Sequence, residues 1–229
     1  EKLEVVGNNC MPIQKEGSPV WIRKEKTTEG EKDSYTISGY KHRGYEMDER
    51  FMMLFPRMYS TNEDHINAYK SWANVKGNRI KVDRCGNMES IVCPTFGENL
   101  KFFFKYQLNF MYFRYFMWNF SGRQNDIQSH GEIDHGNWIT GLSFIDNAML
   151  GDQSNAPAIM RENKGHNRYF LLPLLLGILG ILWQLGNGKK GTQSFWITFT
   201  LFFMTGIAIV IYLNQTPYQP RERDYAYAG

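Results

Sequence analysis

Four consecutive charged residues near the end of the sequence have the chemistry to bind an anion. The stretch "PRERDY" places Arg221, Glu222, Arg223 and Asp224 side by side, shortly after a long apolar run. Arginine stays charged, and its planar guanidinium binds phosphate through two parallel hydrogen bonds. Two interpretations remain open. Arg221 and Arg223, with Asp224 beside them, bind the phosphate of a substrate, or the four residues form an ion-paired loop.

A second polar cluster, "GRQND", directly follows an aromatic stretch and contains Arg123, Asn125 and Asp126. Flat aromatic faces beside planar polar groups are typical of sites that bind sugars. The cluster is therefore a candidate for gripping a sugar or a phosphate, and the alternative is a polar loop that ends a helix.

The stretch "HGEIDHGNW" supplies four side chains that ligate divalent metals, at a spacing that matches no specific metal motif. They are His130, Glu132, Asp134 and His135. We favour a hydrogen-bonded loop here and keep metal binding as the alternative.

The aromatic stretch from Asn99 to Phe120 has to position the "GRQND" cluster, and its polar residues recur at helical spacing. One face gathers Lys101, Lys105, Asn109, Tyr112 and Asn119, whereas Gln107 and Arg114 point the opposite way. A charge at the bilayer centre costs roughly 2.5–3.5 kcal/mol, so we expect a helix at the membrane boundary and keep a true span as the alternative. Arg114 among the rings needs a carboxylate, a bound anion or a backbone carbonyl as its partner.

Two charge-free apolar runs, 169–186 and 194–213, are long enough to cross a bilayer. A short turn with Lys189 and Lys190 joins them, and the positive-inside rule places this turn in the cytoplasm. We therefore predict an α-helical integral membrane protein with a transmembrane hairpin, an aromatic boundary helix and an outer mixed α/β (α+β) region. A buried hairpin in a soluble protein is the alternative.

The pattern divides the chain into four parts. Residues 1–98 form an outer mixed α/β unit, 99–168 the aromatic helix and a polar loop, 169–213 the hairpin, and 214–229 an outer loop that leads to a further membrane helix. Within the first part, "NEDHINAYKSWANVKG" predicts a helix capped by Asn62 or Asp64. The chain does not start with Met, so we expect it to be an internal piece of a longer protein. We also expect it to pack against the rest of that longer chain.

Charge and cysteine usage exclude some classes of function. The net charge of +3 includes no long basic run, which argues against binding of nucleic acid. Cys10, Cys85 and Cys93 fit no zinc spacing. Either Cys85 and Cys93 form a disulfide with Cys10 left over, or the cysteines are free structural thiols, which we favour.

Three strings carry a resemblance to a known family: "YQLNFMYFRYFMWNFSGRQNDIQ", "HGNWITG" and "NQTPYQPRERDYAYAG". They resemble a bacterial family of polytopic membrane proteins of unknown function that is related to the protein O-mannosyltransferases of the GT-C glycosyltransferase superfamily. The resemblance covers residues 95–229 best.

The resemblance implies transfer of a sugar from a polyprenyl-phosphate donor to a protein or another acceptor. It implies a multi-pass protein of the cytoplasmic (inner) membrane with a large periplasmic region, in contact with the bilayer and the lipid-linked sugar. The catalytic carboxylate of the superfamily lies in an N-terminal module outside this sequence, so we assign no catalytic residue. We also assign no cofactor and keep a divalent metal as the alternative. The alternatives are a non-catalytic membrane assembly or transport component and a membrane-anchored carbohydrate-binding module.

Overall fold

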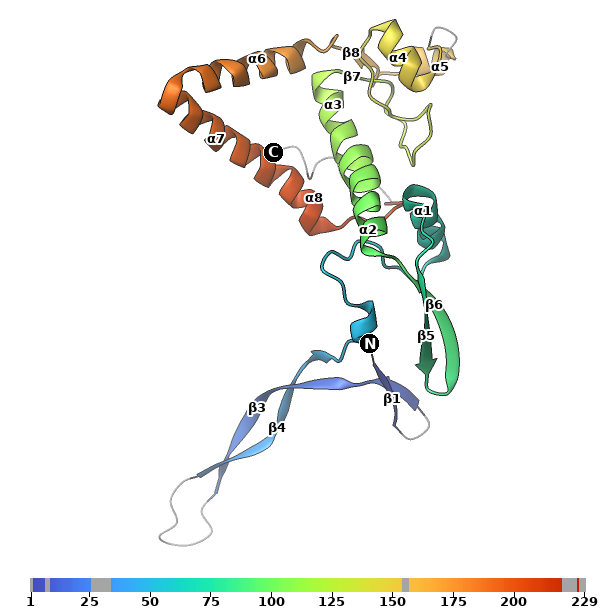
Figure 1. Ribbon diagram of the computed structural model, residues 1–229, viewed down its shortest axis with the longest axis vertical. Coiled ribbons are helices and arrows are strands. Elements are labelled where there is room, and N and C mark those ends of the chain that lie inside the picture. The colour runs from blue at the N-terminus through green and yellow to red at the C-terminus, as the bar shows by residue number, and fades with distance from the viewer. Residues whose placement is uncertain (1, 7–8, 26–33, 154–156, 220–225, 227–229) are drawn as a thin grey trace. The chain divides into compact units, whose positions relative to one another are not determined.

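The computed structural model describes the chain except for residues 1, 7–8, 26–33, 154–156, 220–225 and 227–229 (Figure 1). The chain forms two compact units. Unit 1 comprises Glu1–Pro56 and Lys76–Phe96, and unit 2 comprises Arg57–Val75 and Gly97–Gly229. This division differs from the boundary that we predicted at residue 98, because residues 57–75 pack with the helices of unit 2.

The described part of unit 1 consists of three antiparallel hairpins and one short 3-10 helix. The hairpins pair β1 with β2, β3 with β4, and β5 with β6. Their bounds are β1 Leu3–Val6, β2 Asn9–Pro12, β3 Gln14–Lys24, β4 Ser34–Tyr45, β5 Asn78–Arg84 and β6 Asn87–Cys93, and the short helix is η1 Glu49–Phe51.

The turn of the β5–β6 hairpin carries one half of a disulfide. Cys85 and Gly86 form a two-residue loop with φ angles of 53° and 93°, as the hairpin turn that matches strand twist requires. Cys85 is bonded to Cys10 of β2, and Cys93 is a free thiol whose pKa is raised by burial.

Our expectation for the cysteines was therefore wrong in both forms. Cys93 pairs with Asn78 at the open end of the hairpin, whereas Cys85 lies in its turn. Strand β6 separates them by about 20 Å at 3.3 Å per residue, far beyond the roughly 7 Å that a disulfide can bridge.

The disulfide generates the first prediction. Replacing Cys10 by Ser should lower the free energy of unfolding of unit 1 by roughly 2–4 kcal/mol, because the bond closes a loop across 75 residues. Denaturant titration measures the loss, and Cys93→Ser is the matched control, expected to leave the stability unchanged. Peptide mapping that found Cys85 joined to Cys93 would contradict the assignment.

Unit 2 is built on one long helix with a helical partner. The long helix runs through α2 (Phe96–Phe102), η2 (Phe103–Phe113, a π-helix) and α3 (Arg114–Phe120), and the partner is α1 (Glu63–Ala73). Asn62 caps α1 as predicted, its side chain accepting a hydrogen bond from the Asp64 backbone N–H at 2.8 Å. Trp72 of α1 packs against two rings of the long helix, with centroids 5.1 Å from Tyr106 and 5.0 Å from Phe110.

The burial of the long helix follows the predicted faces except at Tyr112, which belongs to the predicted polar face and is buried. Lys101, Lys105 and Asn109 are exposed, whereas Gln107 and Arg114 are buried. Phe102, Tyr106 and Phe110 recur at four-residue spacing and stack in a row, which forms the centre of the apolar core.

The rest of unit 2 consists of a polar region and three apolar helices. The polar region pairs β7 (Gly122–Arg123) with β8 (Asn167–Arg168) and includes α4 (Ser143–Leu150) and α5 (Ala158–Arg161). The apolar helices are α6 (Leu172–Gly186), α7 (Gly188–Thr205) and α8 (Ile207–Leu213). Figure 1 shows α6 and α7 joined by a sharp bend, with α8 ending beside the long helix.

The predicted fold class, with a hairpin of two transmembrane helices, is wrong. Among the described residues one continuous helical stretch, Gly188–Leu213, which comprises α7 and α8, is long and apolar enough to cross a membrane, with 26 residues and a mean hydropathy of 2.1 over 18 of them. Helix α6 has 15 residues and spans about 22 Å, less than the roughly 30 Å of a hydrocarbon core. It is short because Pro173 sets the helix start at Leu172, while Phe170 and Leu171 adopt left-handed backbone angles outside the helix.

The segment with Lys189 and Lys190, which we predicted to be a turn, is also different in the structure. Lys189 and Lys190 belong to the first turn of α7, and Asn187 alone separates the two helices. The prediction that these lysines lie in the cytoplasm assumed a loop between two membrane-spanning helices. Because the lysines lie within a helix instead, that prediction no longer has a basis.

Candidate functional site

The polar region 121–168 is fixed to the long helix through the carbonyl of Gly136. Arg114 Nη1 and Trp118 Nε1 both donate to this oxygen at 3.1 Å, and the Gly136 N–H donates to Asn125 Oδ1 at 2.8 Å. Gly136 has a φ of 52°, and an added Cβ would lie 2.7 Å from the Ile127 carbonyl oxygen. Glycine is therefore the residue that this junction requires.

The Arg114 side chain pairs with backbone carbonyls, which is one of the kinds of partner predicted from the sequence. Its Nε donates to the Phe110 oxygen at 3.0 Å, in addition to the bond to Gly136, and its side chain is 5% exposed. The guanidinium carbon lies 4.1 Å from the Phe110 ring centroid and 4.9 Å from that of Trp118. Arg114 therefore acts as a buried connector between helix and loop, and its role as a substrate ligand finds no geometric support.

The "GRQND" residues separate into structural and surface positions. Asn125 is fully buried, and it accepts from two backbone N–H groups while donating to the Asp134 oxygen at 2.9 Å. Arg123 is half-buried with its guanidinium carbon 3.9 Å from the Trp118 ring centroid, and Asp126 is exposed. The polar loop that ends a helix is thus the better interpretation of this cluster.

The remaining predicted site residues divide in the same way. Arg221, Arg223 and Asp224 lie outside the described residues. The described part of the chain holds no group of three metal-ligating side chains, so His130, Glu132, Asp134 and His135 form no metal centre there. Two of them pair instead, because His135 Nδ1 lies 2.7 Å from Asp134 Oδ1, and this hydrogen bond lowers the pKa of the Asp134 carboxyl.

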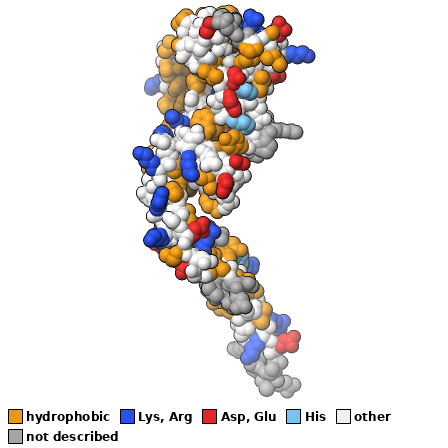
Figure 2. Space-filling view, turned by 90° about the vertical axis from the view of Figure 1, so that its right-hand side faces the viewer, with side chains coloured by type: hydrophobic (Ala, Val, Ile, Leu, Met, Phe, Trp, Pro, Cys, Tyr) orange, Lys and Arg blue, Asp and Glu red, His pale blue; other side chains and the backbone are white. Residues whose placement is uncertain are grey.

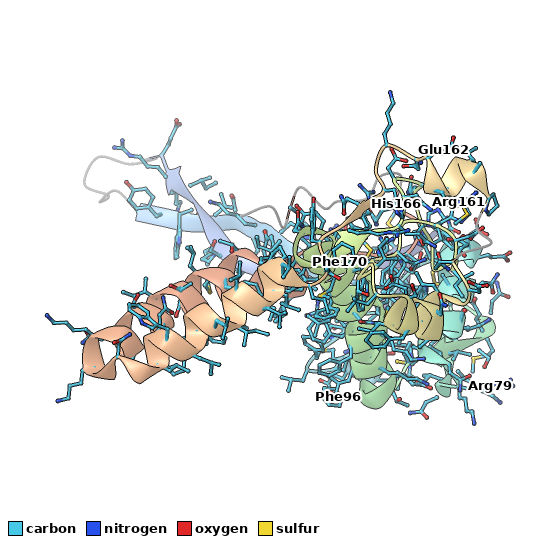
Figure 3. The ribbon with its side chains drawn as sticks, turned by 90° about the horizontal axis from the view of Figure 1, so that it is seen from above. Arg79, Phe96, Arg161, Glu162, His166 and Phe170 are labelled. Carbon is cyan, nitrogen blue, oxygen red and sulfur yellow. A yellow bond between two sulfur atoms is a disulfide. The ribbon has the colours of Figure 1, made fainter. Side chains whose placement is uncertain are left out.

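A pocket lies beside the "GRQND" turn, between β8 and helices α4 and α5. Its volume is about 30 Å³, and it is lined by Gln124, Ile139, Asp146, Gln153, Met160, Arg161, His166 and Arg168. Figure 3 shows Arg161 and His166 close together at the C-terminal end of α5. The lining thus brings two guanidinium groups and one imidazole to the same small space.

The hydrogen bonds of His166 assign a role to each of its two ring nitrogens in this arrangement. Arg168 Nε can only donate, so the His166 Nε2 that it contacts at 3.1 Å has to be the acceptor. His166 Nδ1 then carries the hydrogen and donates to the Gln124 carbonyl oxygen at 2.8 Å. His166 Nε2 thus orients the Arg168 guanidinium through Nε, while the two terminal nitrogens stay outside this bond.

The carboxylate of Asp146 in the pocket lining already accepts hydrogen bonds from neighbouring groups of the chain. Asp146 Oδ1 accepts from the Thr140 N–H at 2.7 Å and from its hydroxyl at 2.8 Å, and Oδ2 accepts from the Gly141 N–H at 2.8 Å. Arg161 and Arg168 form no ion pair with any carboxylate of the described residues. The pocket therefore has a net positive charge and suits an anion.

Sequence reasoning missed this pocket. The available signal was "GHNRYF", which places a histidine and an arginine directly before an apolar helix. The other arginine comes from a helix of four residues, and nothing in the spacing links Arg161 to Gln124. The pairing of β7 with β8 brings these segments together.

Comparisons with known proteins give little further information. Residues 3–104 match a family of unknown function, DUF8416. No curated protein and no solved structure matches the chain. The family match covers less than half of the chain and stops before the polar region, so it assigns neither an activity nor a ligand to the pocket.

The connector role of Arg114 gives the second prediction. Arg114→Met keeps the volume but removes two charge-assisted hydrogen bonds, so it should lower the free energy of unfolding of unit 2 by about 2–3 kcal/mol. Lys105→Met on the exposed face of the same helix is the control and should change it by less than about 0.5 kcal/mol. Denaturant titration in detergent compares the two variants, and equal stabilities would show that Arg114 is not a structural connector.

Proposed function

We propose that this chain is part of a membrane glycosyltransferase that takes its sugar from a polyprenyl-phosphate donor, and that the pocket of Arg161, His166 and Arg168 holds the phosphate. The observation that supports this is a cationic pocket directly before an apolar helix. Arg168 ends β8, and α6 begins at Leu172 with exposed apolar side chains that suit a polyprenyl chain. The resemblance to the O-mannosyltransferase-related family points to the same donor.

The size of the pocket limits what it can hold. A water-sized group needs about 10–15 Å³ by this measure, so a volume of about 30 Å³ admits roughly two oxygen atoms and no sugar ring. The pocket therefore suits the terminal oxygens of a phosphate, with the sugar and the lipid chain outside it. This size disfavours a carbohydrate-binding module whose pocket encloses the sugar itself.

The two arginines match the charge change of the reaction. Transfer breaks the bond between the anomeric carbon and the phosphate oxygen, and the electron pair of that bond remains on the leaving phosphate. Donors held in place before the reaction stabilise this growing charge without reorganising. Arg168, oriented by His166, and Arg161 are the residues in position for this role, and we assign no catalytic base among the described residues.

The location in the inner membrane, with several passes, remains part of this proposal. The helix Gly188–Leu213 supports membrane association by its length and composition. The disulfide between Cys10 and Cys85 supports a periplasmic position for unit 1, because such bonds persist in oxidising compartments. An assembly or transport component would share both features. The phosphate site is therefore what distinguishes the proposed glycosyltransferase from such a component.

The third prediction tests that site with inorganic phosphate and farnesyl phosphate as probes. The double variant Arg161→Gln, Arg168→Gln should weaken binding of both probes by at least roughly tenfold, because it removes two charged donors. Isothermal titration of the chain in detergent measures the affinity, and thermal melting should be unchanged because Arg161 and Arg168 are exposed.

Lys164→Gln, on the same loop but outside the lining, is the matched control for charge and should bind as the unaltered chain does. Arg168→Lys should also bind weakly, since lysine keeps the charge but loses the Nε donor to His166. Unchanged affinity in the double variant, or saturable binding of mannose without any binding of phosphate, would contradict the proposal.

A further inference from the structure

The β3–β4 ribbon of unit 1 contains a β-bulge near the start of β3. Between two pairs of the ladder, Gly17 and Ser18 of β3 lie opposite Lys41 of β4 alone. An extra residue on one strand of an antiparallel pair bends that strand and changes the direction of the side chains beside it. The pairing of β5 with β6 in the same unit is regular by contrast, with no such shift.

A groove of about 350 Å³ opens at this bulge, lined by Gly17, Ser18, Lys41, His42 and Arg43. A Cβ added at Gly17 would lie 3.2 Å from the Arg43 Cβ, so the missing side chain leaves space on the face that Arg43 occupies. The volume is in the range of sites for small molecules. It is about ten times that of the pocket in unit 2, so this groove has room for more than a phosphate group.

Two cations of the groove have no carboxylate partner. Lys41 and Arg43 are two residues apart on β4, so their side chains share a face, with Cα atoms about 6.6 Å apart. Both are exposed, and neither forms an ion pair with a carboxylate of the described residues. Figure 2 shows Lys and Arg side chains at the surface of the ribbon, in the lower part of that view.

The acidic residues of the ribbon and its flanks leave these two cations uncompensated. Glu16 pairs with His42 in the ladder, so it belongs to the opposite face, and Glu46 is paired with Lys2 at 3.4 Å. The acidic residues within 25–33 lie in the segment that joins the other ends of the two strands. From the start of β4 to the groove the distance is about 23 Å at 3.3 Å per residue, far beyond the screening length of about 8 Å.

We propose that the groove binds a phosphate monoester, with Lys41 and Arg43 on the phosphate and the organic group in the remaining space. Such a phosphate has a charge of about −1.5 to −2 at pH 7, which two cations match, whereas a single carboxylate would leave one of them uncompensated. The arginine fork binds two phosphate oxygens, lysine adds a point charge, and Ser18 supplies a hydroxyl donor. This proposal concerns unit 1 and does not rest on the proposed function.

Glycerol 3-phosphate is the soluble probe, and the chain for the test carries Arg161→Gln and Arg168→Gln so that the pocket of unit 2 does not contribute. Isothermal titration of this chain in detergent should show saturable binding with a Kd of about 1 mM or tighter. Acetate, which has one carboxylate, should bind at least roughly tenfold more weakly, because it matches only one of the two cations.

Two further double variants separate the groove from surface charge in general. Lys41→Gln with Arg43→Gln should weaken binding of glycerol 3-phosphate at least roughly tenfold, because both charged donors are lost. Arg79→Gln with Lys81→Gln is the matched control, since these residues have the same charge and spacing on β5 but no bulge beside them. All four side chains are exposed, so an unchanged melting curve confirms that each variant is folded.

Phosphatidic acid presents the same glycerol phosphate as a lipid headgroup, and hydrogen exchange identifies the source. Mixed micelles with phosphatidic acid are compared with micelles that contain phosphatidylcholine, whose phosphate is a diester. Slower exchange at residues 16–19 and 40–43 with phosphatidic acid, but not with glycerol 3-phosphate, would assign the groove to a lipid headgroup. Slower exchange with glycerol 3-phosphate would assign it to a soluble phosphate ester, and either result supports the proposal.

Three results would overturn the inference. One is the absence of saturable binding of both probes up to about 10 mM, which corresponds to an interaction too weak for a specific site. Another is unchanged affinity after Lys41 and Arg43 are both replaced. The third is an equal loss of affinity in the Arg79 and Lys81 variant, which would show that any pair of exposed cations attracts the probe.

Discussion

The hydrogen bond from the buried guanidinium of Arg114 to the Gly136 carbonyl is the constraint on which the arrangement of unit 2 depends. A charge in an aromatic core is costly unless donors and acceptors are matched, so the helix and the loop have to keep the geometry that provides this match. Trp118 donates to the same oxygen, and Asn125 accepts from the N–H of the same residue. Three side chains thus converge on one glycine and fix the loop relative to the long helix.

The pocket follows from this junction in a few short steps. Fixing residues 121–125 sets the position of β7, and β7 pairs with β8 through Gly122 with Arg168 and Arg123 with Asn167. That pairing brings His166 to the Gln124 carbonyl, and His166 then orients Arg168. The connector residues Arg114 and Asn125 therefore position the cationic pocket without lining it.

Periodicity and capping in the sequence predicted several local elements correctly. Asn62 caps α1, and the faces of the long helix follow from the spacing of Lys101, Lys105, Gln107 and Arg114, because side-chain period is a local property. Hydropathy alone misjudged the apolar run at 169–186, since Pro173 and two left-handed residues shorten the helix that the run can form. The disulfide between Cys10 and Cys85 and the pocket of Arg161 with Arg168 join segments distant in sequence, and no local pattern encodes such pairings.

The central claim is that the phosphate of a lipid-linked donor lies in the pocket between β8 and α5. Photo-cross-linking tests it most directly, with a polyprenyl phosphate that carries a diazirine on the isoprene unit next to the phosphate, and with mass spectrometry to map the labelled residues. The account predicts labels within residues 158–175, which include Arg161, His166 and Arg168, and their loss on competition with unlabelled farnesyl phosphate. Labels confined to α7 and α8, unaffected by that competitor, would contradict it.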